Sequence, residues 1–272
     1  MGQIMSKLSK TDVWRWIIIS FVGAYLLIPI FAMLEFSTRG APGERSAEAW
    51  VAIPTFPKLL SSIFSSLQLA VVVIFAVVFI LVPTMIWIHL RLPHLRRIME
   101  LICLLPLTIP AIVIVVGIAP TYRAIYQIFG SSPLTLSFVY FILVLPYSYR
   151  SISASLFSID THTLSEASRS LGASTIRMIS GIIVPNIKVG IMSGAVISIA
   201  LVLGEFTISN LLNFETMQVV INLLGKRDAA TSVAVSLAAL VFAFILLAIL
   251  PTSNRSRSSK LKSNKKTEVM YK

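Results

Sequence analysis

The sequence has few of the residues with which proteins bind metals, form disulfides or carry charge in water. Charged residues make up only 12% of the 272 positions, and Cys103 is the single cysteine. One thiol excludes both a disulfide framework within the chain and a thiolate metal site. The three histidines, His89, His94 and His162, are not spaced as metal ligands. We therefore expect this chain to bind no metal and no cofactor.

Catalytic motifs are missing as well. Gly225-Lys-Arg227 is not a phosphate-binding loop, because it lacks the preceding glycine and the following hydroxyl of the Gly-x-x-x-x-Gly-Lys-Ser/Thr pattern. No Ser/His/Asp set and no pair of carboxylates stands at a usable spacing. We expect a chain that is not an enzyme and that hydrolyses no nucleotide itself.

Long apolar runs are what the sequence has in abundance. Apolar residues make up 56% of the chain, and they gather in runs of about twenty, the length that crosses a hydrocarbon core. Continuous runs indicate helices, because a membrane barrel shows short alternating segments. The sequence thus predicts an all-α polytopic membrane protein with six transmembrane helices: Trp16–Phe36, Ser66–Leu90, Leu101–Tyr122, Leu134–Tyr149, Ile187–Leu212 and Thr231–Leu250.

The net charge of +12 is distributed unevenly about these spans. Six spans place both termini on one side of the membrane, and that side holds 17 of the 23 Lys and Arg residues. The positive-inside rule then puts the termini and residues 160–186 in the cytoplasm. We divide the chain into a membrane domain, 1–251, and a basic tail, 252–272, which we expect to be disordered and attracted to anionic lipid. Membrane lipid, and not nucleic acid, is the expected partner of this charge.

The longest polar interval between two apolar segments is 160–186, and it has helical periodicity. Thr163 and Glu166 have the spacing of a capping box, which predicts a helix beginning at Thr163. Gly172 stands where that helix needs a left-handed stop. Apolar residues recur on one face of the helix, at i, i+3 and i+7: Leu164, Ala167 and Leu171.

A second helical run follows in the same interval. Ile176, Ile179 and Ile183 are spaced to share a face, and Pro185 either ends this run or starts the next helix. Residues 160–186 therefore predict an amphipathic helix–turn–helix flanked by membrane, of a kind that a soluble partner could hold.

These residues also carry a family resemblance. Glu166-Ala167-Ser, three residues, Gly172, nine residues and Ile182-Ile-Val-Pro185 resembles the EAA loop of permease subunits in binding-protein-dependent ABC importers. The family pattern has a second Ala and a Leu where this chain has Ser168 and Val184. Both replacements are small or apolar, so they preserve the helix face.

The resemblance implies a type I ABC importer permease architecture in a bacterial cell membrane. It implies that Glu166, Ala167, Leu171, Gly172, Ile182 and Pro185 couple the chain to a separate ATPase dimer, which would bind ATP and Mg²⁺. The expected partners are that cytoplasmic ATPase dimer, a second permease subunit, identical or homologous, and an extracytoplasmic substrate-binding protein.

The fifth predicted span has two unusual features. Gly190 and Gly194 form a Gly-x-x-x-Gly pair, which lets two membrane helices approach closely, within the subunit or across a dimer. Glu205 is the only acidic residue well inside a span, and an ionisable group there usually faces a cavity or partner. We expect Glu205, with Phe206 and Asn210, to line or gate the translocation pathway, although snorkelling of Glu205 to water is an alternative.

The stretch Gly204-Glu-Phe-Thr-Ile208 resembles permeases of spermidine/putrescine importers, and one carboxylate would suit a polycation. A similar Gly-Glu-Phe occurs in oxyanion importers, so an importer of sulfate or molybdate, phosphonate, iron or thiamine remains an alternative. An ion-coupled secondary transporter that uses Glu205 as its carrier is an alternative of another class; it predicts an internal repeat, and none is evident. A non-transporting membrane scaffold is a third, and it leaves Glu205 unexplained.

Overall fold

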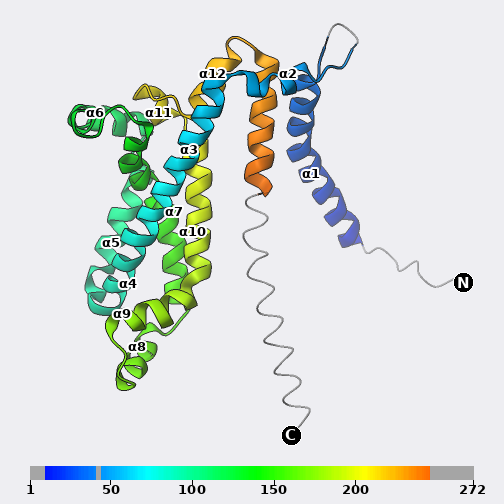
Figure 1. Ribbon diagram of the computed structural model, residues 1–272. Coiled ribbons are helices and arrows are strands. Elements are labelled where there is room, and N and C mark those ends of the chain that lie inside the picture. Colours follow the sequence, from blue (N-terminus) through cyan, green and yellow to red (C-terminus); the bar gives the residue numbers. More distant parts are fainter. Residues whose placement is uncertain (1–9, 41–43, 246–272) are drawn as a thin grey trace, which may run out of the picture. The chain divides into compact units, whose positions relative to one another are not determined.

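A computed structural model describes residues 10–40 and 44–245, and the basic tail 252–272 lies outside them. The described residues are helical, apart from loops and an isolated bridge between Arg39 and Arg45. The all-α prediction is confirmed. The chain divides into two compact units, one of 1–56 with 221–242 and one of 57–220 with 243–272. Figure 1 labels the helices of each unit.

The first unit contains α1 (Lys10–Ser37), α2 (Glu48–Val51) and a 3-10 turn, η1 (Ile53–Thr55). The indole N–H of Trp50 donates to Ser37 Oγ at 3.2 Å and so holds α2 against the end of α1. An apolar helix over Ala229–Ile245 falls mostly in this unit. The first predicted span lies inside α1, and the described part of the sixth lies inside this last helix.

The second unit is a helix bundle. Its elements are α3 (Pro57–Ala76), η2 (Val77–Leu81), α4 (Val82–Arg91), η3 (Pro93–Leu95), α5 (Arg96–Leu104), η4 (Leu105–Thr108), α6 (Ala111–Phe129), η5 (Pro133–Leu136), α7 (Ser137–Phe157), α8 (Thr161–Ser170), α9 (Thr175–Met178), η6 (Ile179–Ile183), α10 (Val184–Gly204) and α11 (Thr207–Leu211). The chain passes to the first unit within α12 (Met217–Gly225).

Among the described residues, four helices are long and apolar enough to cross a membrane: Trp14–Ser37, Lys58–Arg91, Ala111–Phe129 and Thr175–Gly204. Predicted span two lies inside the second of these. Predicted span four, Leu134–Tyr149, covers η5 and the first part of α7, which continues to Phe157. Predicted span five is too long at its far end, because α10 stops at Gly204 and Glu205 is extended.

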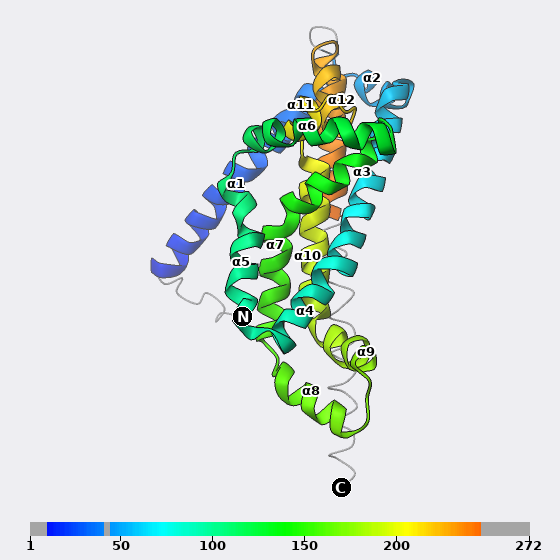
Figure 2. The same ribbon diagram turned by 90° about the vertical axis from the view of Figure 1, so that its left-hand side faces the viewer.

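The third predicted span, Leu101–Tyr122, is wrong as one helix. Prolines 106 and 110 interrupt it: α5 ends at Leu104, a 3-10 turn comes next, and α6 begins after Pro110. Because proline removes a backbone donor and crowds the preceding turn, the chain changes direction there. Figure 2 shows α6 lying across the bundle instead of alongside α7 and α10.

Two of the long helices contain a π turn immediately before a Val-Pro pair. η2 precedes Val82-Pro83 and η6 precedes Val184-Pro185. A π turn admits one extra residue, which relieves the clash of the proline ring with the preceding turn. In each case the residue after proline donates from its side chain to the carbonyl four residues back, Thr84 to Ile80 at 2.6 Å and Asn186 to Ile182 at 2.8 Å. The helices therefore continue through their prolines.

The closest helix pair is α7 with α10. Gly190 and Gly194 of α10 lie against the serine row of α7, where Ser151 Oγ donates to the Gly190 carbonyl at 3.0 Å. Farther along, the hydroxyls of Ser148 and Ser198 are 2.9 Å apart. The Gly-x-x-x-Gly pair thus packs within the subunit, one of the two alternatives that the sequence left open.

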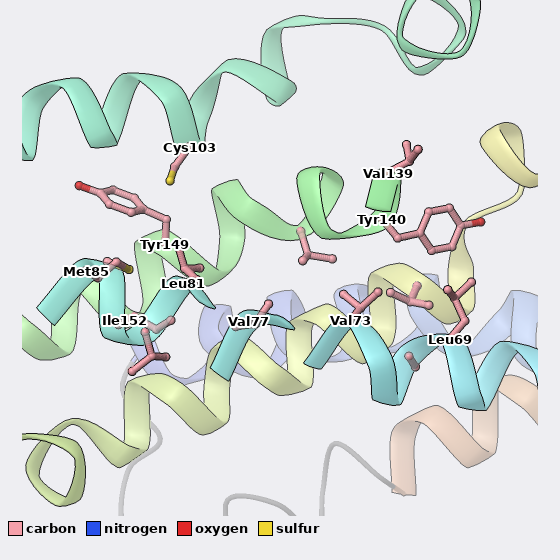
Figure 3. Packing of buried hydrophobic residues seen from close by; sticks show 14 of the residues in the cluster. Leu69, Val73, Val77, Leu81, Met85, Cys103, Val139, Tyr140, Tyr149 and Ile152 are labelled. Carbon is pink, nitrogen blue, oxygen red and sulfur yellow. The ribbon is translucent and has the colours of Figure 1, made fainter. Parts of the chain in front are cut away.

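Apolar side chains from α3, η2, α4, α5 and α7 fill the core beside this pair. Val73, Val77, Tyr140 and Ile152 are fully buried in it (Figure 3). The core continues to Met178, Ile183 and Ile187, so it reaches from the middle of the bundle into the helices of segment 160–186.

We expect Gly190→Ala to destabilise the fold. An added Cβ would clash with Ser155 Oγ and stand 2.7 Å from the Ser151 carbonyl oxygen, so backbone must move. Overpacking of this kind costs about 1–3 kcal/mol. The thermal unfolding midpoint of detergent-solubilised protein is the measurement, and Gly204→Ala on the same helix, with no atom within 4 Å, is the control. Equal midpoints for the two variants would contradict the packing described.

Candidate functional site

Segment 160–186 projects from one end of the second unit as a short helix hairpin, α8 and α9 (Figure 2). The helix α8 begins at Thr161, two residues before the predicted start. Asp160 is its N-cap: Oδ1 accepts the Thr163 N–H at 3.1 Å and Oδ2 accepts the Thr163 hydroxyl at 2.6 Å. The predicted capping box is therefore wrong, because a carboxylate already caps the helix and engages Thr163.

The left-handed stop at Gly172 is confirmed, with φ of +77°. The Gly172 N–H donates to the Arg169 carbonyl at 2.8 Å, and the Ala173 N–H donates to the Ser168 carbonyl at 3.0 Å. These two bonds form a Schellman motif, in which the last carbonyls of a helix are satisfied by a chain that reverses through a left-handed residue. Ser174 then caps α9 by accepting the Arg177 N–H.

The apolar face of the hairpin points away from the bundle. Leu171 is 88% exposed and Ala167 is exposed, while the packed face of α8 consists of small polar residues, Thr161, Ser165 and Ser168. Leu164 is half-buried. Glu166 is also outward, with 70% of its side chain exposed, and pairs with His162 at 3.2 Å. Apolar side chains on this otherwise polar helix are thus exposed in the isolated chain.

The second helix of the hairpin differs from its predicted pattern. Ile176 is 80% exposed, whereas Ile179 is half-buried and Ile183 is fully buried. Ile176 and Ile183 thus differ in burial, and the π turn η6, which starts at Ile179, changes the rotation of the helix between them. Beyond it, Pro185 begins α10 instead of ending the run, so Thr175–Gly204 is one continuous helix.

Ile182 and Pro185 lie on that helix at the base of the hairpin. Ile182 is half-buried and Pro185 is exposed. Of the residues predicted for coupling, Glu166, Ala167, Leu171 and Gly172 thus lie together on α8 and its stop, and the other two lie beyond α9, where the hairpin meets α10.

At the opposite end of the bundle, Glu205 lies at the break between α10 and α11. Its carboxylate accepts the Tyr140 hydroxyl at 2.8 Å and the Ile208 N–H at 2.9 Å, with the Ser209 N–H at 3.3 Å. Glu205 is half-buried, and Tyr140 is fully buried. The carboxylate therefore joins α7 to the start of α11.

The other two predicted pathway residues lie close to this carboxylate in sequence, but the structure does not bring all three together. Phe206 is half-buried and Asn210 is exposed. The polar contacts continue instead through Thr216, whose hydroxyl donates to Ser209 Oγ at 2.9 Å, and through Ser66, which accepts the Met217 N–H at 2.9 Å. Neither Tyr140 nor Ser66 could be identified from the sequence, because a single hydroxyl side chain within an apolar segment belongs to no recognisable motif.

A comparison with protein-family models matches residues 86–253 to the binding-protein-dependent transport system inner membrane component. The match covers more than half of the chain and contains the hairpin. The chain belongs to this family. It is a multi-pass permease subunit of a binding-protein-dependent ABC importer, and such a permease works with an ATPase and a substrate-binding protein. No curated protein matches the chain in a sequence comparison.

We expect the first turn of the permease hairpin to weaken in acid. The hydrogen bond from the Thr163 side chain, then that from its backbone, lowers the pKa of the Asp160 carboxyl below 3.8. A lowered folded-state pKa means that the carboxylate stabilises α8 above pH 3.8 and that this contribution disappears as pH falls through the lowered value. Hydrogen exchange at the Thr163 amide measures it.

The control is Asp160→Asn, since asparagine caps a helix comparably but does not titrate. Protection in this variant should be independent of pH in the same range. Loss of protection in acid that is identical in both proteins would rule out Asp160 as the titrating cap.

Proposed function

We propose that this permease forms half of a translocation pathway and couples to a cytoplasmic ATPase dimer through the hairpin of α8 and α9. The observation that carries the proposal is the exposure of Leu171 and Ile176, at 88% and 80%, on the hairpin that projects from the end of the bundle. Apolar side chains in that position gain by transfer into a groove of a soluble partner. Glu166 and Ala167 border them.

The connection between the hairpin and the pathway is mechanical. α9, η6 and α10 form one continuous helix, Thr175–Gly204, whose far end adjoins Glu205. The serine and glycine rows lock α10 to α7, which enters the hairpin from the other side. We propose that closure of the ATPase dimer, driven by ATP and Mg²⁺ bound there, moves this pair as one body. Gly172 sets the angle between α8 and α9, and Pro185 relays the motion into α10.

For this motion to drive transport, the ATPase must bind one state of the permease more tightly than the other, since equal affinity shifts no equilibrium. The second permease subunit, identical or homologous, supplies the other half of the pathway, and an extracytoplasmic binding protein delivers the substrate. The unequal distribution of Lys and Arg supports a hairpin, and both termini, on the cytoplasmic side.

The bonding of Glu205 argues against the ion-coupled alternative. A carrier must release its partners to take up an ion, yet this carboxylate accepts three protein hydrogen bonds and caps α11. Its bonds suit a residue that maintains the bend between α10 and α11 beside the pathway. We propose this positioning role for Glu205, with Phe206 and Asn210 on the same bend.

We propose a polyamine as the substrate, supported by the Gly204-Glu-Phe-Thr-Ile208 resemblance and by the Glu205 carboxylate at the bend. Uptake of labelled spermidine by cells with the complete importer should be competed by putrescine. Glu205→Gln should reduce uptake about tenfold, as expected when one charged hydrogen-bond acceptor is lost. Competition by sulfate, molybdate, phosphonate, iron or thiamine, without competition by putrescine, would assign the substrate to those classes.

Leu171→Asp tests the coupling surface. Leu171 makes no buried contact in this chain, so the variant should insert and unfold as the wild type does, while ATPase co-purification and uptake fall about tenfold or more, the cost of placing a charge in an apolar interface. The measurement is the ATPase recovered with the tagged permease from membranes.

Ser174→Asp is the matched control, because Asp is an equally good N-cap for α9 and adds the same charge three residues away. Co-purification should remain near the wild-type level in this variant. Normal ATPase recovery and normal uptake with Leu171→Asp would exclude the hairpin as the coupling surface.

A further inference from the structure

A small pocket lies between α4, α5 and α7, near the base of the hairpin. Arg96, the first residue of α5, lines it together with His89, Tyr149, Ser153 and Phe157. The rest of the lining is apolar. The pocket thus combines one guanidinium with two hydroxyl groups and lies outside the coupling surface and outside the Glu205 bend.

The guanidinium of Arg96 has one hydrogen bond and one ring contact within the described part of the chain. One Nη donates to the His89 carbonyl oxygen at 2.6 Å, and the group stacks over the Phe157 ring, with its carbon 5.8 Å from the centroid. Its Nε is buried without any hydrogen-bond partner. Within the described part of the chain, no carboxylate forms an ion pair with Arg96. Arg96 as a whole is only half-buried, so the remaining N–H groups of its guanidinium are available to an anion at the pocket.

The level of the pocket along α4 indicates which kind of anion lies close to it. Trp87 on α4 is half-exposed, and Arg91 lies over its ring at 5.8 Å. A Trp beside an Arg at the end of an apolar helix is typical of the level of lipid headgroups. His89, whose carbonyl binds Arg96, lies between these two residues. The pocket lined by Arg96 therefore lies at the level where phosphate oxygens of lipids are concentrated.

We propose that this pocket binds a phosphate group, and that its source is the headgroup of an anionic lipid. The Arg96 guanidinium and the hydroxyls of Tyr149 and Ser153 are donors suited to phosphate oxygens, and exposed Arg97 and Arg150 add positive charge nearby. Basic pockets between membrane helices on the cytoplasmic side are typical sites for anionic headgroups. The lipid would bridge α4, α5 and the last turn of α7, directly before the hairpin.

The test uses the full-length chain, purified and delipidated, and titrated with phosphatidylglycerol or phosphatidylcholine in mixed micelles. Native mass spectrometry counts the bound lipid. Wild type should hold one phosphatidylglycerol in preference to phosphatidylcholine. Arg96→Gln should weaken this binding about tenfold, and Arg97→Gln, an exposed neighbour with the same charge change, should weaken it less than about twofold.

A parallel titration with inorganic phosphate alone distinguishes the two sources. Displacement of lipid by millimolar phosphate in wild type, but not in Arg96→Gln, would assign the pocket to free phosphate and support the phosphate site. Arg96→Lys serves as a second variant in case the Gln variant does not fold, because Lys retains the charge and a donor for His89 but lacks the planar set of donors of a guanidinium. It should bind phosphatidylglycerol more weakly than wild type does.

Equal weakening by Arg96→Gln and Arg97→Gln, or no preference for phosphatidylglycerol in wild type, would overturn the proposal and leave only non-specific surface charge or bound water. Only the assignment of this pocket to the inner leaflet of the membrane rests on the proposed function. Lipid binding is measured without ATPase or substrate, so a failure here and a failure of the coupling proposal are separate results.

Discussion

The contact between α7 and α10 is the constraint on which the rest of the bundle depends. In a membrane, two helices gain nothing from hiding apolar surface from water, so they associate through close backbone approach and hydrogen bonds. Gly190 leaves no room for a side chain against Ser155, and Ser151 bonds its carbonyl directly. These features fix the register of α7 against α10. Because these two helices flank the hairpin, they also determine its position.

Continuity of the helices through their prolines is the second condition. A sharp kink at Pro185 would let the hairpin move without moving α10. The π turn at Ile179–Ile183 and the Asn186 side chain repair the backbone instead, so the helix continues from Thr175 to Gly204. The same repair at Pro83, with Thr84, makes Lys58–Arg91 continuous. A continuous helix transmits a displacement of one end to the other, so prolines within these two helices are compatible with the proposed coupling.

Much of the fold and of the hairpin could be predicted from the sequence because it depends on local rules. Apolar run length predicted the helices, and Gly172 could be placed because a helix stop of this type needs a left-handed residue. The failures have a common cause: in each, a neighbouring residue or a local change of helix type overrides the signal used for the prediction. Pro106 and Pro110 break a run that is apolar throughout, and the π turn rotates Ile176 away from Ile183. Asp160, and not Thr163, caps α8, because its carboxylate accepts hydrogen bonds from both the amide and the hydroxyl of Thr163.

The two ends of the bundle satisfy their polar groups in different ways, and this difference separates their roles. At the hairpin, caps and the Schellman motif satisfy the backbone of α8 internally, so its apolar face is left for a partner. At the Glu205 bend, hydrogen-bond partners come from two other helices, through Tyr140 of α7 and Ser66 of α3. The Tyr140–Glu205 bond joins α7 to the end of α10, which are packed together, whereas the Ser66–Met217 bond joins α3 to α12. If the hairpin moves as one body with α7 and α10, as proposed, the movement would leave the Tyr140–Glu205 bond intact and would act on the Ser66–Met217 bond.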